Sequence, residues 1–308
     1  MILVTGASGL LGSNFVMEAQ QIGEDIIAVS NLNHIYFSLI KIVQMDLKDK
    51  EKIDELFEAL TPEWVVHCAA LTNVDWCEQH PYETYEINTE ASRNLARAAD
   101  RVGSRFIYIS TDSVFDGSRG NYSENDTPSP INIYAKSKLA GERAVQDESE
   151  SSLIIRTDIY GWNACEKLSL AEWILKELES NRTINGFTDV IFTPILVNDL
   201  SEIIFESMKY KLSGIYNIAG VQACSKYDFA RDIAEIFNLN DQLIEPISIS
   251  DSSLRVPRPR NVTLNTKKIC EKLDISMHDV KSGLKRFKAL RDSGFVNKLK
   301  KIKKEQIC

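Results

Sequence analysis

The feature that most constrains this chain is a glycine-rich segment close to its start. Gly6, Gly9 and Gly12 follow an apolar run at residues 2–5 and open a helical pattern at residues 10–21. In this context Gly6 permits a tight turn, Gly9 lets the backbone approach a pyrophosphate, and Gly12 lets the helix pack closely on a sheet. The free N–H groups of the first helical turn favour an anion, so the pattern predicts a dinucleotide-binding turn rather than a turn without a ligand. The residues expected to contact the dinucleotide here are Gly6, Ser8, Gly9, Leu10, Leu11 and Gly12.

Short β-rich runs alternate with helical patterns along the first half of the chain. We expect strands at residues 2–5, 25–29, 41–45, 64–68, 105–110 and 153–156. Between them, a period near 3.6 residues predicts helices at residues 10–21, 50–60, 82–101 and 131–146. Continuous apolar strands that alternate with helices are typical of a parallel sheet covered by helices on both faces. The predicted fold class is therefore α/β, with a Rossmann-type doubly wound parallel sheet.

The strand-helix alternation loosens after residue 156, which indicates a second, smaller unit. Helices are expected at residues 168–179, 199–209 and 226–237, the last two with Asp199 and Ser225 as N-caps, and extended segments at 189–192 and 215–218. A polar stretch at 245–259 leads to the last helices, and a lysine-rich end at 298–304 is expected to be frayed or solvated. We assign the dinucleotide-binding domain to residues 1–160 and 186–220. A smaller α/β substrate-binding domain takes residues 161–185 and 221–295, and residues 296–308 form a basic tail.

Charge and cysteine usage narrow the class of protein. The 308 residues carry a net charge of −8, which argues against nucleic acid or an anionic membrane as the main partner. No secretion signal or membrane-spanning run is recognisable, and the six cysteines form no CxxC pair, so reduced thiols and a cytoplasmic location are expected. A zinc site from His67, Cys68, Cys77 and His80 is disfavoured, because the first two are adjacent in an apolar strand and point to opposite faces. We expect no metal.

The end of the second predicted strand bears on the choice of dinucleotide. An acidic residue there would bind the adenosine ribose 2′-hydroxyl and repel a 2′-phosphate. This chain has Ser30 and Asn31 instead, and the missing acid favours NADPH. No arginine follows to bind the 2′-phosphate, so NADH stays an alternative. Asp46 and Leu47, after the third strand, are candidates for the adenine site. The alternative role for Asp46 is a helix N-cap.

A tyrosine and a lysine with i,i+4 spacing are candidates for proton chemistry. Tyr134 and Lys138 lie near the start of a predicted helix, so their side chains share one face. A nearby ammonium favours the phenolate of a tyrosine, whose ordinary pKa is roughly 10. The motif is expected to follow the fifth strand by a short loop, and Thr111 at the end of that strand faces the cofactor crevice of an open sheet. Thr111 can then donate a hydrogen bond to a carbonyl that Tyr134 protonates. The alternative for Tyr134 and Lys138 is that they lie on a solvated helix face. The alternative for Thr111 is that its hydroxyl bonds only to a nearby backbone group.

Together these segments resemble the extended short-chain dehydrogenase/reductases, and within them the dTDP-4-dehydrorhamnose reductase family. The resemblance covers nearly everything up to about residue 290 and rests on residues 4–12, 67–78, 87–89, 110–117, 134–142 and 258–259. It implies a catalytic triad of Thr111, Tyr134 and Lys138. It also implies that Cys68, Ala69 and Ala70 line the dinucleotide and that Asn88 supports the lysine and an active-site water. The residues it places near the substrate are Thr72, Asp75, Thr111, Asp112 and Ser113.

Two departures from that family's pattern concern the substrate. Ser113 stands where a tyrosine is usual, and Asp158-Ile159 stands where Ser-Trp is usual. Arg258 lies in the polar loop, where a guanidinium fork would match the diphosphate of a nucleotide sugar; the alternative is a surface arginine in a weak ion pair.

The expected function is an NAD(P)H-dependent reductase of a 4-keto nucleotide sugar, as in dTDP-rhamnose biosynthesis, and the sequence is compatible with a homodimer. Residues 258–264 also resemble the regulatory β subunit of methionine adenosyltransferase, so a dinucleotide-binding regulator is the second hypothesis. An epimerase or dehydratase is the third, although such enzymes usually carry a long insertion and further acid/base residues.

Overall fold

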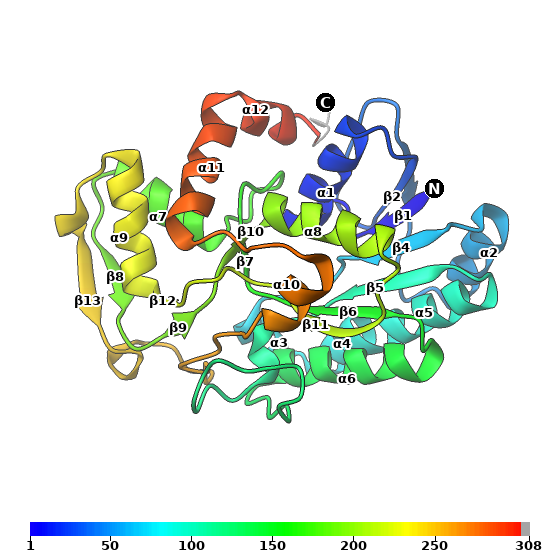
Figure 1. Cartoon of the computed structure of the whole chain (residues 1–308), viewed down its shortest axis with the longest axis horizontal. Coiled ribbons are helices and arrows are strands. Elements are labelled where there is room, and N and C mark those ends of the chain that lie inside the picture. The colour runs from blue at the N-terminus through cyan, green and yellow to red at the C-terminus, as the bar shows by residue number, and fades with distance from the viewer. Residues whose placement is uncertain (303–308) are drawn as a thin grey trace.

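The computed structural model describes residues 1–302 and has a central parallel sheet with helices on both sides (Figure 1). The seven strands lie in the order β11-β6-β5-β4-β1-β2-β3, and all their pairings are parallel. Their bounds are β1 Ile2–Thr5, β2 Ile26–Ser30, β3 Lys41–Gln44, β4 Trp64–His67, β5 Arg105–Ile109, β6 Leu153–Arg156 and β11 Gly214–Asn217. The predicted α/β class and Rossmann-type sheet are confirmed, and the six strands predicted for the first half begin and end within a residue or two of their expected bounds.

Side-chain alternation along the strands gives the sheet two buried faces. Val4 packs with α1 (Leu10–Gln21) and α8 (Val197–Lys209) on one face, whereas Leu3 packs with α2 (Lys50–Leu60) and α5 (Ala91–Arg101) on the other. In Figure 1, α8 lies above the sheet, and α5 and α6 (Ile133–Glu148) lie below it. The continuous apolar strands of the sequence are explained by this double burial.

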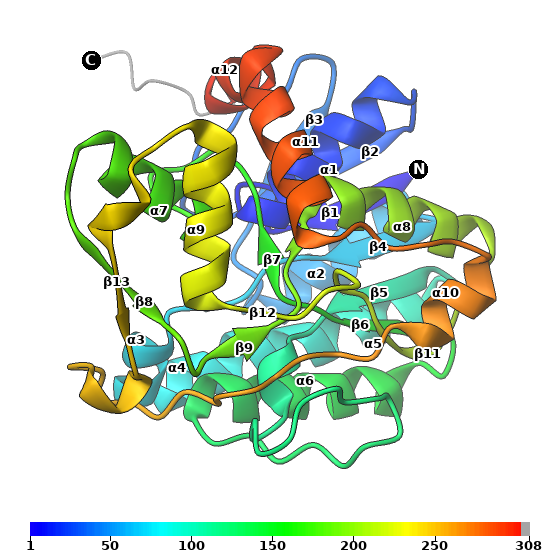
Figure 2. The same cartoon turned by 60° about the vertical axis from the view of Figure 1, so that its left-hand side comes forward.

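The smaller region is built on short strand pairs and helices beside the carboxyl ends of the sheet (Figure 2). Strand β8 (Ile184–Phe187) pairs with β13 (Ile244–Ile247), and β9 (Ile191–Phe192) pairs with β12 (Cys224–Ser225). A further pair joins β7 (Ile159–Tyr160) to β10 (Ile195–Leu196). The helices of the smaller region are α7 Leu170–Glu179, α9 Lys226–Phe237 and α11 Val280–Asp292, with short turns η3 Asp241–Leu243 and η4 Ile249–Asp251. Two further helices pack on the larger region: α10 (Lys267–Leu273) lies against β11, and α12 (Phe295–Lys300) lies against α1.

Helix boundaries follow from the side chains available to cap them. Asn132 accepts a hydrogen bond from the Ala135 amide, so α6 begins at Ile133, two residues later than expected. Ser225 caps α9 as predicted. The Asp199 prediction is wrong: α8 begins two residues earlier with Leu196 as its N-cap, so Asp199 lies in the first turn and pairs with Arg286.

The predicted helix at residues 82–101 is three consecutive helical pieces. These are α4 (Pro81–Tyr85), a π-helical turn η1 (Glu86–Glu90) and α5, preceded by the short α3 (Val74–Gln79). The π-turn widens the helix beside the end of β4 and carries Asn88, which is fully buried. Such turns are frequent at functional sites.

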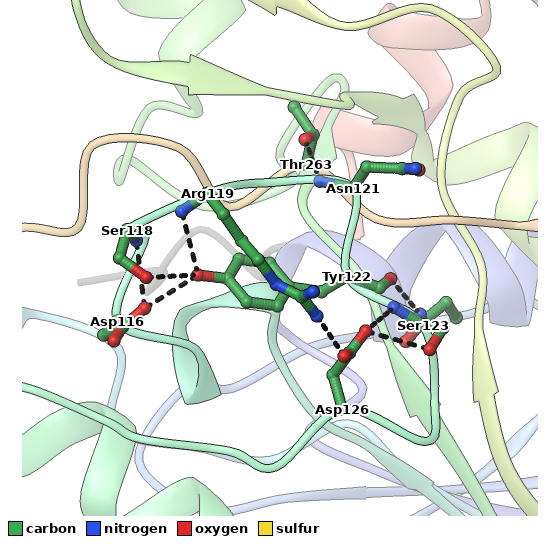
Figure 3. Close-up of polar contacts among 9 residues, drawn as sticks. Asp116, Ser118, Arg119, Asn121, Tyr122, Ser123, Asp126 and Thr263 are labelled. Carbon is green, nitrogen blue, oxygen red and sulfur yellow. Dashed lines mark hydrogen bonds and ion pairs between the residues drawn. The ribbon is translucent and has the colours of Figure 1, made fainter.

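The connection between β5 and α6 is long, which corrects the expected short loop. It spans residues 110–132 and contains one short 3-10 helix, η2 (Asp112–Val114), and a further turn closed by the Asp126 amide and the Ser123 carbonyl. Its far end is held by polar contacts (Figure 3): the Tyr122 hydroxyl donates to Asp116 at 2.7 Å, and the Asn121 amide donates to the Thr263 hydroxyl at 2.6 Å. The second contact ties this connection to the C-terminal part of the chain.

The C-terminal end is ordered against the core as far as the structure describes it. Leu299 and Ile302 are buried, and the Ile302 carbonyl accepts a hydrogen bond from the Tyr36 amide, so residues 298–302 are not frayed. The lysines of this segment are exposed, as expected for a solvated end. Residues 303–308 of the predicted basic tail lie outside the described residues. Across residues 1–302, none of the helices combines the length and the apolar character that crossing a membrane requires.

Candidate active site

The glycine-rich turn is packed against the end of β4, where a side chain would not fit. Gly6 has φ +65°, and a Cβ placed there would lie 2.5 Å from the backbone nitrogen of Ala69. At Gly12 a Cβ would overlap the Gly6 carbonyl oxygen. Gly9 is the N-cap of α1 and has no capping side chain, so the N–H groups of the first turn are left for an anion. The turn therefore lies next to Cys68, Ala69 and Ala70, as a dinucleotide site requires.

The second strand ends beside the same turn. Ser30 is the last residue of β2 and is buried. The side-chain amide of Asn33 donates a hydrogen bond to the Ser8 hydroxyl at 3.1 Å. Asp46 does not cap a helix: its carboxylate accepts from the Lys48 amide, and Asp49 is the N-cap of α2. That alternative for Asp46 is therefore wrong. The adenine-site roles of Asp46 and of the buried Leu47 remain predictions.

Tyr134 and Lys138 project from the first turns of α6 toward the end of β5. The Lys138 ammonium donates to the Ile109 carbonyl at 2.7 Å and lies 4.0 Å from the centroid of the Tyr108 ring. Burial lowers the pKa of Lys138 to about 7, and the nearby Glu142 carboxylate opposes that effect. Burial raises the pKa of Tyr134 well above its usual value, and a hydrogen bond with Thr111 works in the opposite direction. The structure thus brings the predicted triad of Thr111, Tyr134 and Lys138 together.

Asn88 joins the segment after β4 to α6. Its side chain accepts from the Leu71 amide at 2.8 Å and donates to the Ser137 hydroxyl at 3.0 Å. The backbone carbonyl of Asn88 accepts a hydrogen bond from the Tyr108 hydroxyl at 3.1 Å. Asn88 therefore holds the residue that precedes Lys138 rather than contacting the lysine itself, and the predicted role toward a water remains a prediction.

Beneath the triad lies a buried ion pair that sequence reasoning missed. Arg156 at the end of β6 donates two hydrogen bonds to Glu142, at 2.9 and 2.7 Å, and the Ser110 hydroxyl donates to the same carboxylate at 2.5 Å. The side chains of Arg156 and Glu142 are 3% and 1% exposed. Glu142 follows Lys138 by four residues, so it continues the i,i+4 pattern of Tyr134 and Lys138 by one more helical turn. That spacing could have indicated that Glu142 lies on the same helix face.

A cavity of about 430 Å³ opens beside the triad, between the sheet and the smaller region. Its walls are mainly apolar and include Trp173 and Phe187, which the sequence analysis did not single out. The cavity is lined by Asp112, Ser113, Asp158, Leu170, Trp173, Ile174, Ile184, Asn185, Phe187, Val190, Phe192, Lys226, Ala230, Ile249, Leu254, Arg258, Pro259 and Val262. An apolar pocket with a few convergent polar groups is the usual form of a small-molecule site.

Three of the six residues predicted to contact the substrate line the cavity. Asp112, Ser113 and Arg258 belong to the lining. Asp75 instead pairs with Arg258 at 2.8 Å, and the Thr72 hydroxyl accepts from Lys167 at 2.5 Å. The other terminal nitrogen of Arg258 donates to the Val256 carbonyl at 2.9 Å, so both arms of the guanidinium are engaged within the protein. The predicted contact with a diphosphate remains a prediction.

The candidate zinc ligands have other partners. One ring nitrogen of His67 lies 2.6 Å from the Thr5 hydroxyl and the other lies 2.9 Å from the Ser92 hydroxyl. Burial lowers the pKa of His67 to about 3, so the ring is neutral at pH 7. His80 lies outside this interior and stacks on Trp76. No group of three or more side chains suited to a metal occurs among residues 1–302.

Comparison with known proteins places this site in a family. The family model described as the RmlD substrate binding domain matches residues 1–291. Among solved structures, dTDP-4-dehydrorhamnose reductase from Bacillus anthracis, in complex with NADP, superposes with a TM-score of 0.83 at 28% sequence identity. That alignment covers 94% of this chain and 98% of the other.

Curated relatives include both a reductase and a regulatory subunit. The chain is 32% identical over 285 residues to the "Probable low-salt glycan biosynthesis reductase Agl14" of Haloferax volcanii, covering 91% of this chain and 95% of that protein. It is also 32% identical over 275 residues to methionine adenosyltransferase 2 subunit beta of Rattus norvegicus, covering 87% of this chain and 81% of that protein. With the glycine turn, the triad and the cavity in place, the chain belongs to the RmlD substrate binding domain family of NAD(P)-dependent sugar-nucleotide reductases.

Proposed function

We propose that this protein is an NADPH-dependent reductase of a 4-keto nucleotide sugar. The observation that carries the proposal is the convergence of Thr111, Tyr134 and Lys138 next to Asp112 and Ser113, which line an apolar cavity. The glycine turn nearby has no room for side chains at Gly6 and Gly12. A dinucleotide bound along that turn would supply a hydride to the keto carbon. The bound NADP of the Bacillus anthracis relative supports the choice of NADPH.

Each member of the triad has a separate task in this reaction. Thr111 donates a hydrogen bond to the carbonyl oxygen and so stabilises the negative charge that develops there. Tyr134 gives its proton to that oxygen, which becomes the new hydroxyl. Lys138, as an ammonium, stabilises the phenolate that Tyr134 leaves and holds the ribose of the dinucleotide. Burial makes the phenolate costly without such a cation, because it raises the pKa of Tyr134.

Tyr134→Phe tests the proposal most directly. Removing the proton donor should reduce the rate of NADPH oxidation with dTDP-4-dehydrorhamnose by roughly two or more orders of magnitude, with NADPH affinity nearly unchanged. Tyr210→Phe is the matched control, since Tyr210 is half exposed on the surface, and it should retain full activity. A Tyr134→Phe protein that keeps most of its activity would refute the assignment.

A dinucleotide-binding regulatory subunit is the second candidate, supported by the 32% identity to methionine adenosyltransferase 2 subunit beta. Cofactor binding does not distinguish the two functions, because both need the glycine turn. Turnover does: the reductase oxidises NADPH with a 4-keto-6-deoxy nucleotide sugar, and the Thr111→Val, Tyr134→Phe double variant does not. Absence of turnover, together with co-purification of a methionine adenosyltransferase, would favour the regulator.

A further inference from the structure

Two charged side chains face each other in the cavity, and the triad mechanism uses neither of them. Asp158 lies between β6 and β7, and Lys226 is the first residue of α9, so they come from different parts of the fold. The Lys226 ammonium is 3.4 Å from an Asp158 carboxylate oxygen and 3.1 Å from the centroid of the Phe192 ring. The Lys226 side chain is 23% exposed and the Asp158 side chain is 29% exposed, so each keeps access to the cavity.

The backbone around both residues is held in place by hydrogen bonds. The Lys226 amide donates to the Val190 carbonyl at 3.0 Å, and the Asp158 carbonyl accepts from the Ile195 amide at 3.0 Å. Ser225, immediately before Lys226, caps α9 through the Asp228 amide at 2.9 Å. The pair is therefore presented from ordered elements, as a recognition site requires.

A third polar group lies next to the pair at the catalytic end of the cavity. Asp112 is 3% exposed, and one of its oxygens accepts from the hydroxyls of Thr111 and Ser113. Its other oxygen, Oδ2, is buried and has no hydrogen-bond partner within residues 1–302. A buried polar atom without a partner is costly, so a donor from a bound molecule would be favourable there. Asp112, Asp158 and Lys226 thus provide three polar groups in the lining of a mainly apolar cavity.

We propose that Asp158 and Lys226 together bind two adjacent hydroxyl groups of the substrate's sugar ring and so determine which sugar is accepted. This inference rests on the proposed function, because it takes the cavity to be the nucleotide-sugar site. A lysine ammonium only donates hydrogen bonds, a carboxylate only accepts them, and a hydroxyl does both. One hydroxyl can therefore accept from Lys226 while its neighbour donates to Asp158.

The surroundings make this pair selective. Hydrogen bonds to charged groups are roughly twice as strong as neutral ones, and they are stronger in an apolar cavity than in water. A sugar that lacks one of the two hydroxyls would lose one charge-assisted hydrogen bond and would therefore bind less tightly than a sugar that has both.

The test measures the affinity of nucleotide sugars against that of the free nucleoside diphosphates. Calorimetry with NADP⁺ present compares dTDP-rhamnose with dTDP, and UDP-glucose with UDP, for wild type, Asp158→Asn and Lys226→Met. Lys209→Met, which removes an exposed lysine paired with Glu206, is the matched control. Each cavity variant should weaken binding of the preferred nucleotide sugar by about tenfold to a hundredfold, with the affinities for its nucleoside diphosphate and for NADP⁺ unchanged. NADP⁺ binding also shows that the variants are folded.

Three other outcomes count against the inference. If both variants bind the nucleotide sugar as wild type does, the pair does not contact the sugar. If they lose affinity for the sugar and for the nucleoside diphosphate equally, Lys226 acts on the diphosphate and the inference is also wrong. If wild type binds no more tightly to any nucleotide sugar than to its nucleoside diphosphate, the proposed function fails, and this inference fails with it.

Discussion

Removal of the buried carboxylate beneath the triad is expected to destabilise the fold strongly. In Glu142→Gln the Arg156 guanidinium loses the opposite charge of its bidentate partner while staying buried, with its side chain only 3% exposed. Breaking one half of a buried ion pair costs about 3–5 kcal/mol. The glutamine keeps one acceptor oxygen for Arg156, which places the expected loss near about 3 kcal/mol in the free energy of unfolding. For a chain of this size that corresponds to a fall in Tm of roughly 6 °C.

Two comparisons isolate the cause of that loss. Glu58→Gln removes a carboxylate that meets Arg101 at 2.7 Å with its side chain 66% exposed, and it should cost less than about 1 kcal/mol. The double variant Glu142→Leu, Arg156→Met removes both charges and should recover much of the stability, because no buried charge is left alone. Denaturant unfolding of the four proteins at pH 7 gives the three differences.

The same change should alter the pH dependence of the reaction. The Glu142 carboxylate raises the pKa of Lys138, so its removal should lower that pKa below about 7. The ammonium form of Lys138 is then lost at a lower pH, and kcat/KM for the dinucleotide should fall earlier as pH rises. A Glu142→Gln protein within 1 kcal/mol of wild-type stability and with an unshifted pH profile would refute this account of the ion pair.

Two further predictions concern the cofactor and the interior. Because Ser30 and Asn31 provide no acid at the end of β2, NADPH should bind at least as tightly as NADH in calorimetric titrations, and a strong preference for NADH would contradict that interpretation. Burial keeps the pKa of His67 near 3 in the folded state against 6.5 for the unfolded chain, so the unfolded state binds the extra proton between those values. Stability should therefore fall as pH drops below about 6.5, by roughly 1.4 kcal/mol per unit from this residue. In His67→Asn that contribution to the slope should vanish, and an identical slope in both proteins would show that His67 does not remain neutral.

The sheet, the glycine turn and the triad could be predicted because each depends on short-range patterns. Strand and helix periodicities are properties of neighbouring residues, and the turn from Gly6 to Gly12 is specified by the backbone geometry it must adopt. Tyr134 and Lys138 share a helix face through i,i+4 spacing alone. Thr111 could be placed because the carboxyl ends of parallel strands meet at one edge of a sheet.

The contacts that complete the site depend on the tertiary structure. Glu142 meets Arg156 because β6 lies beside β5 in the sheet. Asp158 meets Lys226 because the segment after β6 and the start of α9 line the same cavity. These partners are many residues apart, and no periodicity links them. The length of the connection after β5 was missed for a related reason, since its polar turns carry no periodic pattern. The sequence by itself determined which chemical groups are available and the fold class that positions the triad, and only the packing of distant segments decided which charges are paired, buried or left facing the cavity.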